Sequence, residues 1–225
     1  MSSGPDRPVV VAGSISIDRN LVDGRCFHKL GGVPVYAGLT YARAGLPTIL
    51  VANAAGTDIG RFDEIAAAGL QTRWGPSPGT TRFENRMVGG LREQRVSSLA
   101  RTISWGDMRP AAERAAWVHL GPLHPGDFDA EVFERLIRVS ARVVLDLQGL
   151  VREIRSGHVV PTPSPLLPEA LQATEIVKGS TAETEVVLTA LPAWRVLSAL
   201  RPEIGQWDLA RLVFEGLIER QRGRG

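Results

Sequence analysis

Short apolar runs alternate with longer amphipathic segments along most of the chain. The apolar runs are rich in Val, Ile, Leu and Ala, a pattern typical of buried strands, and they lie within residues 7–18, 47–56, 115–123, 141–149 and 174–180. Segments with apolar residues three and four apart predict helices over residues 33–44, 57–70, 126–140, 180–191 and 207–221. Because strands and helices alternate, we expect an α/β fold with a doubly wound, mostly parallel sheet and helices on both faces.

Two polar stretches do not fit this layer. Residues 20–32 and 80–99 show a more polar, strand-like alternation, and the second has Gly89 and Gly90 at its centre as a turn. We expect these stretches to form a small β lid over one edge of the sheet. Ligands of such sheets bind at the carboxyl ends of the strands, and the residues predicted to lie there or on the lid are Asp18, Gly31, Gly32, Gly121, Asp146 and Lys178.

The composition is that of a soluble globular protein with one domain, or one domain and a small lobe. The chain has 225 residues, of which 44% are hydrophobic and 22% charged. Its formal net charge of +2 is too small to indicate nucleic-acid binding, and no run of about 18 apolar residues predicts a membrane span. The first residues lack the pattern of a secretory signal, and a single cysteine, Cys26, fits a reducing cytoplasm.

Several candidate positions allow both a structural and a functional interpretation. Asp18 either caps a turn or binds ligand hydroxyl groups, for which a carboxylate is suited because it accepts two hydrogen bonds. Gly31 and Gly32 are either turn glycines or positions where a ligand approaches the backbone closely. Glu183 either closes a capping box with Ser180 at the start of a helix or lies near a metal ion and phosphate.

Six segments, in this order and at this spacing, resemble the PfkB/ribokinase family of carbohydrate kinases. They are VAGSISID (11–18), LGGVPVYAGLTYARAGL (30–46), LVANAAGTDIG (50–60), TTRFENRMVGGLREQRV (80–96), VVLDLQGLVR (143–152) and IVKGSTAE (176–183). The resemblance implies a ribokinase-like fold and transfer of a phosphoryl group from ATP, with Mg²⁺, to a hydroxyl of a small sugar or polyol. It also implies a homodimer formed through the lid strands.

The resemblance assigns roles on the substrate side. Asp18 matches the family's aspartate that binds substrate hydroxyls, and Gly31 and Gly32 match the glycine pair against which the substrate lies. Tyr36 stands where many relatives carry an asparagine that bonds the sugar. Its ring either stacks on a sugar face or fills the core.

The resemblance also assigns roles on the side of the phosphate donor. The segment KGSTAE is similar to the family's Asn-x-x-Glu element, with Ser180 in place of the asparagine and Glu183 retained. In relatives the glutamate helps to organise Mg²⁺ and phosphate, usually through water. Lys178 is the cation of this phosphate-proximal group.

The last part of the chain departs from the family pattern. Relatives carry a Gly-Ala-Gly-Asp turn whose backbone N–H groups face the phosphate and whose aspartate takes the proton. Here Gly205 and Asp208 keep only the Gly-x-x-Asp spacing, and Trp207 replaces the second glycine. We therefore expect a core of residues 1–190, an atypical helical tail of residues 191–225 and an incomplete nucleotide-binding part. Asp208 is either the base or a helix N-cap.

Three hypotheses of function stay open at this point. The chain is a sugar or polyol kinase with weak or no activity, a non-catalytic sugar-binding protein, or a kinase fragment whose reading frame is broken near residue 190. Binding of Mg-ATP separates the first hypothesis from the second. Marginal folding would indicate the third, because lost strands leave a sheet edge and helix faces uncovered.

Overall fold

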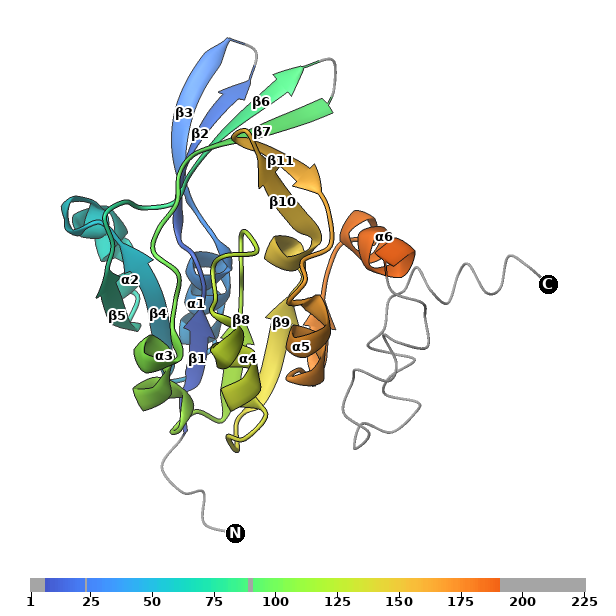
Figure 1. Cartoon of the computed structure of the whole chain (residues 1–225). Coiled ribbons are helices and arrows are strands. Elements are labelled where there is room, and N and C mark those ends of the chain that lie inside the picture. The colour runs from blue at the N-terminus through green and yellow to red at the C-terminus, as the bar shows by residue number, and fades with distance from the viewer. Residues whose placement is uncertain (1–6, 23, 89–90, 191–225) are drawn as a thin grey trace.

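The computed structural model describes residues 7–22, 24–88 and 91–190, and this part of the chain forms two six-stranded sheets (Figure 1). One sheet is parallel throughout, in the order β12-β9-β8-β1-β4-β5. Its strands are β1 (Val9–Ala12), β4 (Thr48–Ala54), β5 (Gln71–Pro76), β8 (Trp117–Leu120), β9 (Arg142–Asp146) and β12 (Ile176–Lys178). The expected doubly wound, mostly parallel sheet is confirmed.

Strand β5 is the one strand of this sheet that the apolar pattern does not predict. Its residues alternate between exposed and half-buried, because it lies at the edge of the sheet beside β4. The segment therefore lacks the continuous apolar run that marks a strand buried on both faces. Each of the five predicted segments does contain a strand of the sheet.

The second sheet is the lid, with strand order β10-β11-β7-β6-β2-β3. The hairpins formed by β2 (Ser16–Val22) with β3 (Arg25–Gly31) and by β6 (Arg82–Val88) with β7 (Leu91–Ser98) confirm the small β lid. A third hairpin, β10 (Arg152–Arg155) with β11 (His158–Pro161), extends the lid and is not predicted. Its turn is Ser156-Gly157, both at positive φ, and a Ser-Gly pair is a weaker turn signal than Asn-Gly.

Helices cover both faces of the parallel sheet. Alternate residues of β4 divide the core into two layers, with Leu50 and Ala52 on the side of α1 and α2, and Ile49 and Val51 on the side of α3, α4 and α5. The helices are α1 (Val33–Arg43), α2 (Asp63–Ala67), α3 (Trp105–Ala112), α4 (Ala130–Leu136), α5 (Leu167–Gln172) and α6 (Thr181–Ala190).

Some helical segments differ from the expectation. The helix predicted over residues 57–70 is wrong in its first half, which is a 3-10 helix (η1, Gly56–Phe62) containing Gly60, a residue of low helix propensity. Helix α3 is not predicted, and it carries Pro110 in its interior. Helix α5 is not predicted either. It has Pro168 in its first turn, where the missing N–H of proline costs no helical hydrogen bond.

The lid joins the core where three backbone segments pass close together. The chain leaves β1 for β2 through Gly13, and it leaves β3 for α1 through Gly32. A Cβ on Gly13 would lie 2.2 Å from the carbonyl oxygen of Gly121, and a Cβ on Gly121 would lie 2.2 Å from Val33 Cβ. These glycines are required by packing, and the junction places the lid over the carboxyl edge of the parallel sheet (Figure 1).

In the part of the chain that the structure describes, no helix is both long and apolar enough to cross a membrane. The tail of residues 191–225, including the helix predicted over 207–221, lies outside the described residues. Asp208 and Trp207 lie there as well.

Candidate functional site

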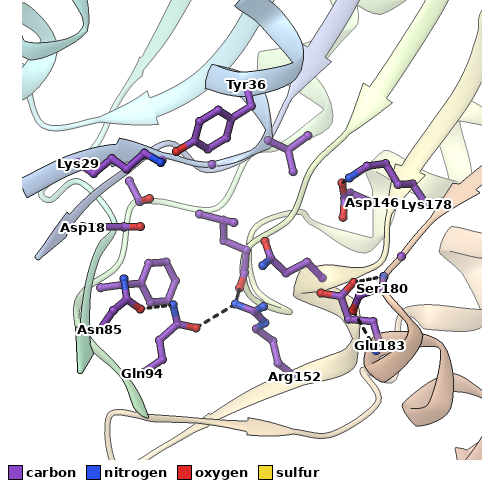
Figure 2. Close-up of a pocket in the computed structure, with 18 of the residues that line it drawn as sticks. Asp18, Lys29, Tyr36, Asn85, Gln94, Asp146, Arg152, Lys178, Ser180 and Glu183 are labelled. Atoms are coloured by element: carbon purple, nitrogen blue, oxygen red, sulfur yellow. Dashed lines mark hydrogen bonds and ion pairs between the residues drawn. The ribbon is translucent and has the colours of Figure 1, made fainter. Parts of the chain in front are cut away.

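A pocket of about 710 Å³ lies between the lid and the carboxyl edge of the parallel sheet. Figure 2 shows its labelled residues arranged around an open centre, with Asp18 and Tyr36 on one side and Lys178 and Glu183 on the other. Apart from Gly121, every candidate residue within the described ranges lines this pocket: Asp18, Gly31, Gly32, Tyr36, Asp146, Lys178, Ser180 and Glu183. The structure therefore brings together both groups of residues that the sequence suggested.

Asp18 is held on the pocket side of strand β2, next to the glycine pair. In the antiparallel pairing of β2 with β3, Gly31 lies opposite Ser16, two residues before Asp18. A Cβ on Gly31 would lie 2.6 Å from Ser16 Oγ and 3.0 Å from Asp18 Oδ2. The absence of a side chain at Gly31 thus keeps space beside the Asp18 carboxylate on the pocket wall.

Gly32 has a different structural role. It is the N-cap of α1, with φ 97° and ψ 148°, a conformation that side chains disfavour. A Cβ there would lie 2.3 Å from the carbonyl oxygen of Ser14, in the segment that leads from β1 to β2. Gly32 is therefore a turn glycine that also lines the pocket, so the two interpretations of this residue are compatible.

Tyr36 lies on the pocket wall and does not fill the core. Its side chain is 49% exposed, its hydroxyl donates to the carbonyl of Leu30 at 3.1 Å, and Lys29 Nζ lies 5.3 Å from the ring centroid. The core-filling interpretation is wrong, because the first turn of α1 directs the ring toward the lid. One face of a phenol in this position can pack against an apolar face of a ligand ring.

The opposite wall carries one cation and two carboxylates. Lys178 and Asp146 are neighbours in the pairing of β12 with β9, and Lys178 Nζ lies 2.6 Å from Asp146 Oδ2. The Ser180 N–H donates to Glu183 Oε2 at 2.8 Å, and the Glu183 N–H donates to Ser180 Oγ at 3.3 Å. The capping box is therefore present, and its glutamate also lines the pocket.

The sequence did not single out several polar residues of the lid that face the pocket. They are Asn20, Lys29, Asn85, Gln94 and Arg152, together with Gln148 at the end of the parallel sheet. Asn20 could have been found, because it lies two residues after Asp18 on a strand and therefore on the same face. The others depend on which strands pair and in which register, and a single sequence does not give that information.

A buried histidine lies on the parallel sheet next to this site. His119 Nδ1 is 3.0 Å from the Tyr41 hydroxyl, and among the described residues no hydrogen-bond partner reaches the buried Nε2. Burial lowers the pKa of His119 from 6.5 to about 4, an effect that Asp146 opposes and Lys178 reinforces. Burial also raises the pKa of Tyr41, so both groups are neutral at pH 7.

His119 is expected to make the stability of the fold depend on pH between 6.5 and 4. Because the pKa of His119 is lower in the folded state, the folded protein keeps its full stability above pH 6.5 and loses stability as the pH falls toward 4. One pKa unit corresponds to about 1.36 kcal/mol, so the loss reaches about 3 kcal/mol. Urea unfolding at pH 7.0 and pH 4.5 measures this loss, which should be about 2 kcal/mol smaller in His119→Asn. The exposed histidine variant His28→Asn is the control, and equal pH slopes for wild type and His119→Asn would contradict the expectation.

Comparisons with known proteins show which solved structures this fold resembles. No protein-family model and no curated protein matches the chain. Among solved structures, a pyrophosphate-dependent kinase of the ribokinase family, solved with a pyrophosphate analog and myo-inositol, matches at 25% identity and a TM-score of 0.76, over 85% of this chain and 69% of that one. The chain is a ribokinase-like protein. The resemblance that its sequence motifs indicated is thereby confirmed.

Other ribokinase-like structures agree. A pyrophosphate-dependent myo-inositol-1 kinase that substitution converts into a myo-inositol-3 kinase matches at 25% identity and a TM-score of 0.74, over 85% of this chain and 68% of that one. A fructokinase from Xylella fastidiosa with bound ATP matches at 20% identity and a TM-score of 0.68, over 86% of this chain and 66% of that one. The second likeness supports the ribokinase-like fold alone.

Proposed function

We propose that this ribokinase-like chain binds a small sugar or polyol beside Asp18 and transfers a phosphoryl group from ATP to one of its hydroxyls. One observation carries the proposal. A carboxylate wall suited to hydroxyl groups faces, across a single pocket, a wall with Lys178, Ser180 and Glu183, which suits a phosphate donor. The kinase solved with myo-inositol and a pyrophosphate analog supports both halves.

The residues on the donor side fit Mg²⁺ as an ion that keeps most of its waters. In the described ranges, no group of three or more His, Cys, Asp or Glu side chains could hold a metal ion by itself. Mg²⁺ is, however, commonly bound by one or two carboxylates together with phosphate oxygens, and Asp146 and Glu183 both line this wall. Bound there, Mg²⁺ would offset the negative charge on the transferred phosphoryl group.

Phosphoryl transfer also needs a group that accepts the hydroxyl proton. Asp208 is the candidate from the sequence, and it lies outside the described residues. A non-catalytic sugar-binding protein is the second candidate function. The described residues build the proposed acceptor wall, whereas the sequence has Trp207 where the family's catalytic turn has its second glycine.

A homodimer through the lid strands is part of the same proposal. Phe27 pairs with Asn20 across β2 and β3, and Met87 lies two residues beyond Asn85 on β6, so both side chains lie on the pocket-facing side of the lid. Phe27 is 49% exposed and Met87 is 48% exposed. Burial of these apolar side chains against a second copy would support a dimer.

Asp18→Asn is expected to weaken polyol binding by about 10- to 100-fold, because the charged acceptor of two hydroxyl hydrogen bonds becomes a neutral amide. Calorimetric titration with myo-inositol and with fructose, in the absence of any donor, measures this affinity directly. Asp129→Asn is the matched control, because Asp129 is exposed at the start of α4 and makes no side-chain cap. Its affinity should stay within about twofold of the wild type.

The outcomes separate the candidate functions. A wild-type chain that binds neither myo-inositol, nor fructose, nor any related sugar would overturn the proposal as a whole. Binding followed by a phosphorylated product, detected by mass spectrometry with ATP and Mg²⁺ or with pyrophosphate, supports the kinase and identifies its donor. Binding without product from either donor supports the sugar-binding protein.

A further inference from the structure

The pocket-facing side of the lid carries a row of hydrogen-bonded amides. Asn20, Asn85 and Gln94 are paired in register on the adjacent strands β2, β6 and β7. Asn85 Nδ2 donates to Asn20 Oδ1 at 3.0 Å, and Gln94 Nε2 donates to Asn85 Oδ1 at 2.9 Å. These three side chains, which we call the amide ladder, all line the pocket (Figure 2).

Arg152 ends the ladder on the third hairpin. Its Nη1 donates to Gln94 Oε1 at 3.3 Å and approaches the carbonyl of Leu123 at 3.5 Å. A guanidinium only donates hydrogen bonds, so Gln94 must turn its oxygen toward Arg152 and its NH₂ toward Asn85. The same constraint passes to the next amide, so that Asn85 turns its NH₂ toward Asn20.

The hydrogen bond donated by Arg152 thus specifies one polarity for the ladder. Each amide presents an oxygen at one end and an NH₂ at the other, and turning it over exchanges the acceptor and the donors. An exchange of oxygen and NH₂ in all three amides together would keep both hydrogen bonds between them but would lose the bond from the guanidinium. The two arrangements offer opposite patterns of donors and acceptors to a molecule in the pocket.

We propose that Arg152 is a specificity-determining positioning residue, which fixes the polarity of the amide ladder and thereby selects among stereoisomers of a cyclic polyol. The inference rests on the proposed function of the pocket. Epimers present the same hydroxyl groups in different directions, so a fixed donor and acceptor pattern leaves a buried polar group unpaired with the wrong isomer. A ladder of mixed polarity adapts to either isomer and discriminates less.

One rival explanation is that Arg152 only braces the lid against Leu123. Another is that its guanidinium, which lines the pocket, binds the polyol directly. Three variants and two measurements separate these explanations. Arg152→Met removes the donor, and Arg152→Lys keeps a charge but lacks the planar fork. Arg155→Met is the matched control, because Arg155 is an exposed arginine of the same strand, paired with Glu153 on the lid.

The first measurement is calorimetric titration of the full chain with myo-inositol and its epimers. Arg152→Met is expected to bind the preferred isomer about 10-fold more weakly and the others within about twofold, so that discrimination falls about 10-fold. Arg152→Lys should lie between Arg152→Met and the wild type, and Arg155→Met should match the wild type. A uniform loss for all isomers, with the ranking kept, would overturn the inference and support the brace.

The second measurement needs no ligand. In ¹⁵N-labelled protein, the side-chain NH₂ signals of Asn85 and Gln94 should shift or broaden in Arg152→Met and stay unchanged in Arg155→Met. Unchanged signals in Arg152→Met would overturn the polarity role, whatever the polyols do. A wild type that binds no isomer overturns the proposed function, and with it the selection of stereoisomers, so the two failures are distinguishable.

Discussion

Replacing Gly32 with alanine is expected to lower the free energy of unfolding by about 2–6 kcal/mol. The first cause is backbone strain, since Gly32 has φ 97° and ψ 148°, and such a conformation costs a residue with a side chain about 1–3 kcal/mol. The second is a clash, since the new Cβ would lie 2.3 Å from the Ser14 carbonyl oxygen and 3.2 Å from Ile15 Cα. Relief of such overpacking costs about 1–3 kcal/mol more. Urea unfolding monitored by circular dichroism measures the total.

The same helix provides the control for this variant. Gly45 follows the C-terminal end of α1 with φ 79°, but no atom lies within 4 Å of the position that its Cβ would take. Gly45→Ala should therefore show only the strain of a left-handed backbone, about 1–2 kcal/mol. A loss in Gly32→Ala no greater than the loss in Gly45→Ala would show that the lid junction relaxes freely around the added methyl group.

The fold could be predicted where burial leaves a continuous apolar pattern. All seven residues of β4 are buried, and the continuous apolar run over residues 49–52 predicts a central parallel strand. The residues of β10 and β11 are half-buried or exposed, so this hairpin has no continuous apolar run. Nothing in its local pattern separates it from a loop, and only pairing of β11 with β7 makes it part of the lid.

The same distinction applies to the pocket. Asp146 and Lys178 could be predicted to share a cleft because they end strands β9 and β12, and the carboxyl ends of parallel strands meet at one edge. Asp18 lies on lid strand β2, and it could be predicted to face the same cleft because the lid was expected over an edge of the sheet. The contribution of Asn85 and Gln94 could not, because both lie on strands of mixed polarity whose pocket-facing side is set by the register of β6 with β7. A shift of one residue would direct each of these side chains to the opposite face.

Asp127 shows how a residue with an ordinary sequence context can hold the junction together. Its side chain is 2% exposed and accepts hydrogen bonds from Ser14 Oγ at 2.5 Å and from the Leu123 N–H at 2.5 Å. The Gly126 N–H donates to His124 Nδ1, and the other ring nitrogen, Nε2, faces Asp127. His124 Nε2 lies 2.6 Å from Asp127 Oδ1, but the geometry of this contact is not that of a hydrogen bond.

Asp127→Ala is expected to lower the free energy of unfolding by about 3–5 kcal/mol, because it leaves several buried donors unpaired, at about 1–3 kcal/mol each. Asp127→Asn should lose less, since its amide oxygen still accepts one of these hydrogen bonds. The control is Asp129→Ala, because Asp129 is the exposed N-cap of α4 and makes no side-chain cap, so a change of about 0.5 kcal/mol or less is expected. Urea unfolding of the three variants decides the point. If Asp127→Ala and Asp129→Ala lower the free energy of unfolding equally, water replaces the carboxylate and backbone packing alone holds the junction. A large loss in Asp127→Ala only would show that this carboxylate joins the segment before Asp18 to the loop that lines the pocket.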